Sequence, residues 1–303
     1  MVERFKQGKL IWINLKNPST IEVQKAMVEL DLPPLLMGDL TTTVPRNSAI
    51  KVEDTVKITL DFPVVKQLNI DHQYEVKFLI SKKSLLTVQY EEMEGIDRFK
   101  RQFEVATTLR KTQKNITGTH LFISLFNNLY DTTSSKLDYI ESKLADIESQ
   151  IFENNEKQMV YEISNVSKKL IAFRHTIHGH EDIFEEMKSL FGDMHGKVFE
   201  DDLEGIRAQY FALQRKANTQ YETLAALRET NAAMLTTKQN EVIKTLTIMA
   251  FITFPLTLFS SMFGMNTEAT PIIGHKADFW IIVSIMVAVT ISFFIFFRRK
   301  KWL

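Results

Sequence analysis

A chain of 303 residues is long enough for a soluble domain and further elements beside it. Its 37 basic and 37 acidic residues cancel, which argues against a nucleic-acid-binding surface, because such a surface needs a basic excess. The chain has no cysteine, so disulfides and thiolate metal sites are excluded.

Residues 1–95 are predicted to form an α+β domain. Short apolar or alternating runs predict strands over 10–15, 56–62, 74–80 and 85–90. A polar turn with Glu22 close behind it predicts a helix over 20–30, which stops at Pro33 and Pro34. The first residues carry no apolar signal-peptide stretch, so we expect this domain to stay in the cytosol. The pattern leaves the strand order open.

The next segment, 96–200, is predicted to be a helical stalk. Prolines are absent from it, and apolar side chains recur at helical spacing from Leu137 to Ile151. Gly192, Gly196 and Gly205 predict breaks or caps near one turn. From about Asp201 no breaker occurs before Pro255, so a helix of about 90 Å over 201–262 is expected, within a segment 201–263 that enters the membrane.

Two other clusters could carry metal chemistry. His175, His178 and His180, with His195 nearby, fit no usual zinc spacing, so a structural or surface role is favoured. Asp201 and Asp202 stand where the long helix is expected to begin, where carboxylates cap the positive end of a helix.

Two uncharged runs, 245–267 and 279–297, predict membrane spans, since about twenty apolar residues in a helix cross a bilayer. A pair of buried core helices is the alternative. Between the spans lies a short loop, 264–278, and after them a basic tail, 298–303. Lysine and arginine are concentrated before the first span and after the second, which predicts a cell-membrane protein with both termini in the cytoplasm and an extracellular loop. Trp280 and Trp302 fit interfacial anchors.

The first span is the more polar of the two. Threonine and serine interrupt it, and Pro255 lies inside it. This contrast suggests that the first span lines a water-filled pore; the alternative is that these hydroxyls bond local carbonyls or pack between helices. Because two helices cannot enclose a pore, the pore hypothesis requires a cyclic homo-oligomer.

A short motif, Gly264-Met265-Asn266, closes the first span after Phe263. It is preceded by Asn240-Glu-Val-Ile-Lys-Thr-Leu-Thr-Ile and by Phe254-Pro-Leu-Thr, and the second span is followed by Arg-Arg-Lys-Lys-Trp-Leu. Over 240–303 this layout resembles the CorA magnesium transporter family, whose signature is Gly-Met-Asn, a short loop and a second span. Over the rest of the chain the resemblance is one of layout, with Trp12-Ile-Asn-Leu and Pro18 similar to the family's first strand and turn.

The resemblance implies a funnel-shaped homopentamer with the first span around the pore. Gly264, Met265 and Asn266 would form the selective mouth, where neutral oxygens accept hydrogen bonds from the water shell of Mg²⁺. The positions implied to line the pore are Asn240, Ile243, Leu246, Thr247 and Thr257. Without the resemblance, Asn266 is interpreted as a helix C-cap, Gly264 as a packing glycine, and the pair Ile243 and Leu246 as ordinary packing rather than a hydrophobic gate.

The resemblance further implies regulation by cytosolic Mg²⁺ at subunit interfaces, for which Asp201 and Asp202 are candidates. The loop after the motif departs from the family's Met-Pro-Glu-Leu, and Glu268 is its one clear acid before Asp278, so cation attraction is expected to be weaker. Mg²⁺ is thus expected as substrate and as regulatory ligand, with Co²⁺ or Ni²⁺ as surrogates. We expect membrane lipid as a partner, no organic cofactor and no enzymatic activity, because no phosphate-cradling loop or nucleophile motif occurs.

Two rival functions stay open. A zinc transporter of the same superfamily is one, although such proteins usually carry isoleucine where Met265 stands. The other is a membrane-anchored coiled-coil adaptor that conducts nothing.

Overall fold

The computed structural model describes residues 1–41, 47–63, 74–109, 116–265, 274, 277–300 and 302, with the side chains of 108–109 and 192–198 also outside the description. The chain divides into two compact units, Met1–Arg228 and Glu229–Leu303.

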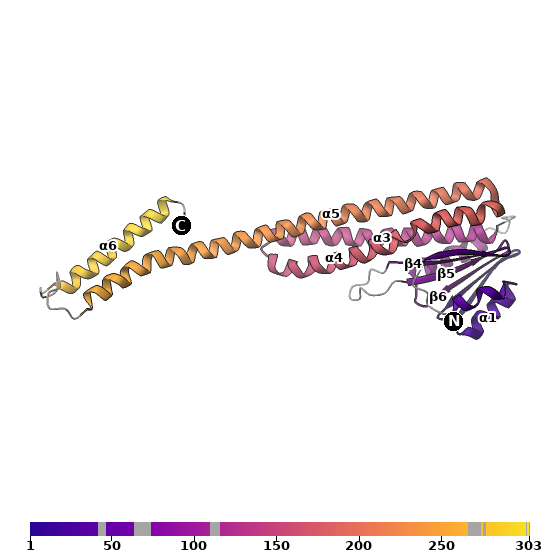
Figure 1. Cartoon of the computed structure of the whole chain (residues 1–303), viewed down its shortest axis with the longest axis horizontal. Helices are drawn as coiled ribbons and strands as arrows, with labels where there is room; N and C mark the ends of the chain where they lie inside the picture. Colours follow the sequence, from indigo (N-terminus) through magenta and orange to yellow (C-terminus); the bar gives the residue numbers. More distant parts are fainter. Residues whose placement is uncertain are drawn as a thin grey trace. The chain divides into compact units, whose positions relative to one another are not determined.

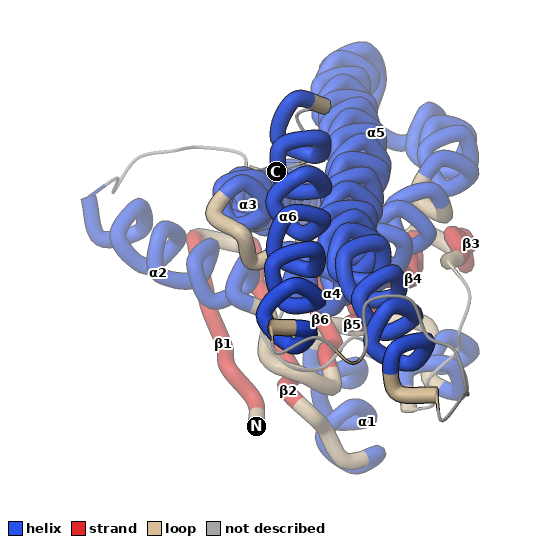
Figure 2. Tube along the Cα trace, turned by 90° about the vertical axis from the view of Figure 1, so that its left-hand side faces the viewer, coloured by secondary structure: helices blue, strands red, loops and turns tan. Residues whose placement is uncertain are grey.

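The first unit contains a six-stranded mixed sheet in the order β1-β2-β6-β5-β4-β3. The strands are β1 (Val2–Gln7), β2 (Leu10–Lys16), β3 (Ser48–Val52), β4 (Thr55–Phe62), β5 (Tyr74–Ile80) and β6 (Ser84–Gln89). β2 and β6 are parallel, and the other neighbouring strands are antiparallel. Figure 2 shows β1 on one flank of this sheet and β3 on the other.

The strands predicted from alternating or apolar runs are β2, β4, β5 and β6, and the structure confirms all of them. The two edge strands, β1 and β3, were not predicted. β3 has no fully buried residue, whereas every residue of the central strand β5 is buried. An edge strand covered on few sides needs no continuous apolar run, so its sequence signal is weak.

One face of the sheet is covered by α1 (Thr20–Glu29), with the short 3₁₀ turns Pro34–Leu36 and Gly38–Leu40 beyond it. Ser19 caps α1, and Glu22 reaches back to the Ser19 N–H (2.9 Å), which completes a capping box at the helix start expected from the sequence. The helix buries Val23, Ala26 and Met27 in a core that also contains Ile13, Leu15, Leu79, Leu86 and Val88 from the sheet.

The opposite face packs against α2 (Glu94–Leu109) and α3 (Gly118–Phe152). Aromatic rings dominate this layer. Phe78 lies 5.2 Å from Phe122 between ring centroids, and Trp12 lies 5.4 Å from Phe99. Fully buried aromatic side chains contribute large apolar areas, so this layer is a main source of stability for the unit.

Helix α4 (Glu156–His178) returns alongside α3, and α5 (Glu181–Phe263) follows after a short turn. The apolar residues predicted to form helix seams are buried, among them Leu137, Ile140, Leu203 and Ile206. The Lys216 ammonium pairs with Asp138 and lies 3.2 Å from Glu141, which ties α5 to α3.

Helix α5 reverses direction between Phe191 and Phe199 (Figure 1). The Tyr210 hydroxyl donates to Glu181 at 3.2 Å across 29 residues, a separation of about 43 Å in a straight helix. The chain therefore reverses in the region where the sequence predicted a turn, between Phe191 and Phe199. The prediction of a further break at Gly205 is wrong, because Gly205 lies inside the helix that follows.

After the reversal, a helix of 65 residues, Phe199–Phe263, contains the one predicted over 201–262. This stretch and α6 (Asp278–Arg299) are the helices long and apolar enough to cross a membrane in the part of the chain that the structure describes. In the second unit α5 and α6 meet through Phe251 and Phe297, whose ring centroids lie 6.3 Å apart. Ile248 and Phe297 are both buried there.

Candidate functional site

Eight positions form one stripe along α5 and the residue that follows it, here called the 240–264 stripe. Successive members are alternately three and four residues apart, an average of about 3.5, so they stay on one face of a helix. The members are Asn240, Ile243, Thr247, Ala250, Phe254, Thr257, Ser261 and Gly264.

This stripe lies on the side of α5 away from α6. The positions covered by α6 are the buried Ile248 and the half-buried Ile252, Pro255 and Phe259. At about 100° per residue, these residues lie on the opposite side of the helix from the stripe. Six members of the stripe are exposed and Thr247 and Ala250 are half-buried; Phe254 is 72% exposed, against 5% for Ile248.

Most residues expected from the sequence to line a pore fall on this stripe: Asn240, Ile243, Thr247, Thr257 and Gly264. Leu246 adjoins Thr247 and is 60% exposed. The sequence interpretation did not assign Ala250, Phe254 and Ser261 to the pore, because it took its pore positions from the family resemblance and not from the spacing. The regular three-four interval was the signal that could have found them.

The threonine hydroxyls of the first span each donate to the carbonyl four residues earlier. The bonds run from Thr247 to Ile243 (2.8 Å) and from Thr257 to Thr253 (2.9 Å), and Thr245 and Thr253 make the same bond. These hydroxyls therefore do bond local backbone carbonyls, which was the alternative to a pore role. This bonding does not compete with a pore role, because a hydroxyl that donates inward still has acceptor lone pairs that point outward.

Helix α5 ends at Phe263, so the carbonyl oxygens of its last turn lack the partners that a continuing helix would supply. The Gly264 N–H donates to Ser260 (3.0 Å) and the Met265 N–H approaches Met262 (3.4 Å). Gly264 is not in the left-handed region, so it is not the usual C-capping glycine. The end of a long helix has a partial negative charge on its carbonyls, and this favours a cation nearby. Asn266 and Glu268 lie outside the described residues.

The candidate regulatory carboxylates do not form a metal site within one chain. Asp201 is exposed and Asp202 is half-buried, near the start of the helix that follows the reversal. Among the described residues, no group of three or more histidine and acidic side chains could hold a metal ion.

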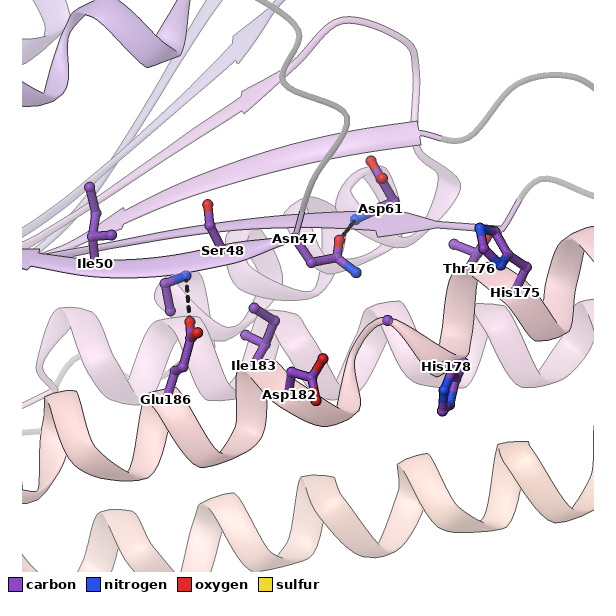
Figure 3. A pocket seen from close by; sticks show the side chains of 12 residues that line it. Asn47, Ser48, Ile50, Asp61, His175, Thr176, His178, Asp182, Ile183 and Glu186 are labelled. Atoms are coloured by element: carbon purple, nitrogen blue, oxygen red, sulfur yellow. Dashed lines mark hydrogen bonds between the residues drawn. The ribbon is translucent and has the colours of Figure 1, made fainter.

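A cavity of about 600 Å³ lies between the edge strand β3 and the α4–α5 turn (Figure 3). The Ala49 N–H donates to Glu186 Oε2 (3.0 Å), so one carboxylate is used to close the sheet edge. Asp182 is exposed, and the Asp61 carboxylate points to the other side of the strand. The cavity therefore lacks converging ligands.

His180 has a structural role beside this cavity, while His175 and His178 are exposed. Its Nε2–H donates to the Asp61 carbonyl (2.6 Å), so Nδ1 accepts from the Tyr130 hydroxyl (2.8 Å). Burial lowers the pKa of His180 from 6.5 to about 4, and the imidazole is neutral at physiological pH. The side chain of His195 lies outside the described residues.

The fold is a mixed sheet with helices on both faces, the long helix of α5 and the apolar helix α6, and these two helices are candidate membrane spans. The sequence profile of the family described as CorA-like Mg²⁺ transporter protein matches residues 7–299. The chain belongs to this family, whose members are membrane ion transporters.

Individual relatives agree with this assignment. The cobalt/magnesium transport protein CorA of Thermotoga maritima is 24% identical over 297 residues, 96% of this chain and 83% of the relative. The CorA magnesium transporter structure from Methanocaldococcus jannaschii has a TM-score of 0.83 at 20% identity and covers 99% of this chain and 93% of its own. The ZntB cytoplasmic domain of Vibrio parahaemolyticus has a TM-score of 0.53 at 12% identity and covers 75% and 88%. At these identities the solved structures show a shared fold.

Proposed function

We propose that this chain forms a homopentameric channel that conducts hydrated Mg²⁺ passively into the cytosol. The observation that carries the proposal is the 240–264 stripe, which runs along the first span away from α6 and ends in the Gly-Met-Asn motif. Copies of α5 around an axis would turn the stripe inward. A repeat of about 3.5 residues suits helices that wind around one another in such an assembly.

The stripe has the chemistry that a channel for a hydrated dication needs. Mg²⁺ loses its water slowly, so a fast path must accommodate the hydrated ion. The carbonyl of Gly264 and the carboxamide of Asn266 would accept hydrogen bonds from that water at the mouth, and Thr257 would do so deeper in the span. Neutral oxygens bind weakly enough to release the ion. Ile243 and Leu246 would form a hydrophobic gate that closes by excluding water.

The remaining sequence assignments follow from this proposal. Segment 1–95 and the stalk 96–200 would lie in the cytosol, and 201–263 would continue into the membrane. The loop 264–278 would be extracellular, with Glu268 attracting cations, before the span 279–297 and the basic tail 298–303. Both termini would be cytoplasmic, as the lysine and arginine bias suggests. Cytosolic Mg²⁺ bound between subunits at Asp201 and Asp202 would favour the closed state.

Ion flux tests the proposal. Purified protein in liposomes with an internal Mg²⁺ indicator should pass Mg²⁺, and Asn266→Ala should reduce the flux at least about tenfold, because the mouth loses its amide oxygens. Co²⁺ and Ni²⁺ should compete, and internal Mg²⁺ should slow entry. Flux unchanged in Asn266→Ala would refute the assigned mouth.

A zinc transporter of the same superfamily is the second candidate. Met265 argues against it. Simultaneous flux of Zn²⁺ and Mg²⁺ into the same liposomes separates the two, and Mg²⁺ should dominate. A non-conducting adaptor would pass neither ion.

A further inference from the structure

Four basic side chains gather at one end of the α5–α6 pair in the second unit. Arg298, Arg299 and Lys300 end α6 directly after the uncharged run 279–297. Lys244 lies one turn before Ile248, which is buried where α5 meets α6 near Phe297. All four side chains are exposed, and none takes part in an ion pair between described residues.

The segment that carries these charges is held in a fixed position. After Lys300 the chain folds back, and the Trp302 N–H donates to the Phe297 carbonyl (3.0 Å). The Trp302 ring stacks on Phe297 at 5.9 Å, and Phe297 stacks on Phe293 at 6.3 Å. Phe297 is 4% exposed, so this column of rings is packed. The basic residues therefore stand at a set level just past the apolar length of α6.

Copies of this chain cannot neutralise the cluster with residues of the second unit. Glu241, one turn before Lys244, is the acid of that unit closest in sequence to the four cations, and Asp278 begins α6 at its other end. Each copy in an oligomer would bring the same four cations and, within one turn of Lys244, the same single carboxylate, Glu241. Within the second unit, a positive excess therefore remains at this end of α6 at any stoichiometry. Interaction with the negative C-terminal end of the α6 dipole accounts for part of this positive charge. That interaction is confined to the last turn of α6 and does not involve Lys244.

We propose that Lys244, Arg298, Arg299 and Lys300 bind the phosphate of an anionic phospholipid in the adjacent leaflet. The charges stand where headgroups begin, next to a tryptophan that is 44% exposed and suited to the interface. Guanidinium groups bind phosphate oxygens in a bidentate manner, and basic residues beside a bilayer attract anionic lipids. The acyl chains would lie along the exposed side chains of α6. This inference depends on membrane insertion and not on ion conduction.

The test counts bound lipid on the purified full-length protein in a neutral detergent by native mass spectrometry. Phosphatidylglycerol and phosphatidylcholine are titrated separately, and inorganic phosphate is added as a competitor. The wild type should retain phosphatidylglycerol with at least about tenfold higher affinity than phosphatidylcholine, and phosphate should not displace it.

The variant Arg298→Gln, Arg299→Gln, Lys300→Gln should lose this preference. Its matched control removes the same charge from exposed lysines of the first unit: Lys6→Gln, Lys9→Gln, Lys25→Gln. The control should keep the preference. Trp302→Ala keeps every charge but releases the segment, so it should weaken phosphatidylglycerol binding severalfold. Size-exclusion profiles check that each variant assembles, and the three single glutamine variants replace the triple variant if it does not.

Equal retention of the two lipids by the wild type would overturn the proposal. So would a preference that survives the triple variant, because the lipid would then bind elsewhere. Displacement by inorganic phosphate would identify a soluble-anion site instead. Each result is independent of Mg²⁺ flux, so failure here and failure of the channel proposal can be told apart.

Discussion

Gly118 begins α3 in a narrow space beside the β5–β6 turn. A Cβ at this position would lie 2.2 Å from the Ser81 carbonyl oxygen and 2.4 Å from that of Ser84. Neither backbone oxygen can move without disturbing the turn. Gly118→Ala should therefore lower the free energy of unfolding by about 2 kcal/mol, measured as a lower Tm in detergent.

Gly205 provides the matched control, because it is a helical glycine with no atom within 4 Å of the place that an alanine methyl group would take. Gly205→Ala should leave the Tm unchanged or raise it, since alanine is favoured over glycine in a helix by up to about 1 kcal/mol. Equal destabilisation by both substitutions would contradict the packing described at Gly118.

His180 should make stability depend on pH. Its pKa is lowered from 6.5 to about 4 by burial, so the unfolded chain binds more protons between these values. Stability is fully present above pH 6.5 and is lost as the pH falls toward 4, by roughly 3 kcal/mol in total. His180→Gln should have a lower Tm at pH 7.5 and a shallower loss below pH 6.5.

Asp61 titrates in the opposite sense, because burial raises the pKa of its carboxyl. The difference between the wild type and His180→Gln therefore isolates the histidine. His178→Gln, at an exposed position, should behave like the wild type. An identical pH slope in His180→Gln would show that the buried imidazole is not the group that titrates.

A comparison of Thr257 with Thr245 distinguishes a pore role from a purely local hydrogen bond. Both hydroxyls donate to the carbonyl four residues earlier, at 2.9 Å and 3.0 Å, but only Thr257 lies on the stripe. Valine keeps the shape and removes the oxygen. Thr257→Val should reduce Mg²⁺ flux severalfold, while Thr245→Val should leave it near the wild-type value. Similar flux in the two variants would remove Thr257 from the ion path.

At the scale of elements, α5 is the part of the chain that the proposed function depends on most. The absence of native cysteines makes it suitable for cysteine substitution. Ala250→Cys, Phe254→Cys and Ser261→Cys should react with a water-soluble thiol reagent in membranes. Ile252→Cys and Phe259→Cys, on the α6 side, should react at least about tenfold more slowly. Similar reaction rates for the cysteines on the stripe and for those on the α6 side would contradict a water-facing stripe.

The sequence pattern predicted the buried central strands and the capped helix α1, but it missed the edge strands β1 and β3. The central strands β4 and β5 have continuous buried runs, and the capping box at Ser19 marks α1. The edge strands lack such a signal. In the candidate site, the motif and the polar positions were recognisable from residue type. Ala250, Phe254 and Ser261 share the three-four spacing that the sequence contains, but which side of α5 is covered by α6 is a tertiary property that the sequence pattern does not give.

The reversal of α5 shows the same limit. The glycines of the sequence predicted a turn in the region where the chain reverses, but Gly205 lies inside the continuous helix Phe199–Phe263. Glycine tolerates a turn without requiring one. Long-range contacts accompany the reversal, such as the buried rings of Phe184 and Tyr210 at 5.4 Å, and no local sequence pattern contains them.

For the whole molecule, the central claim is that several copies of α5 enclose a path for Mg²⁺. The inside-negative potential of a membrane favours entry of a dication by about 4.6 kcal/mol per 100 mV. A passive channel should therefore respond steeply to the imposed voltage without any other energy source.

The most direct measurement is Mg²⁺ entry into proteoliposomes under a set potential, using Phe254→Cys before and after thiol modification. Entry should rise with an inside-negative potential and should fall to the level of protein-free vesicles after modification, while modified Phe259→Cys stays active. Entry that ignores the potential, or that survives a bulky adduct at position 254, would contradict the account.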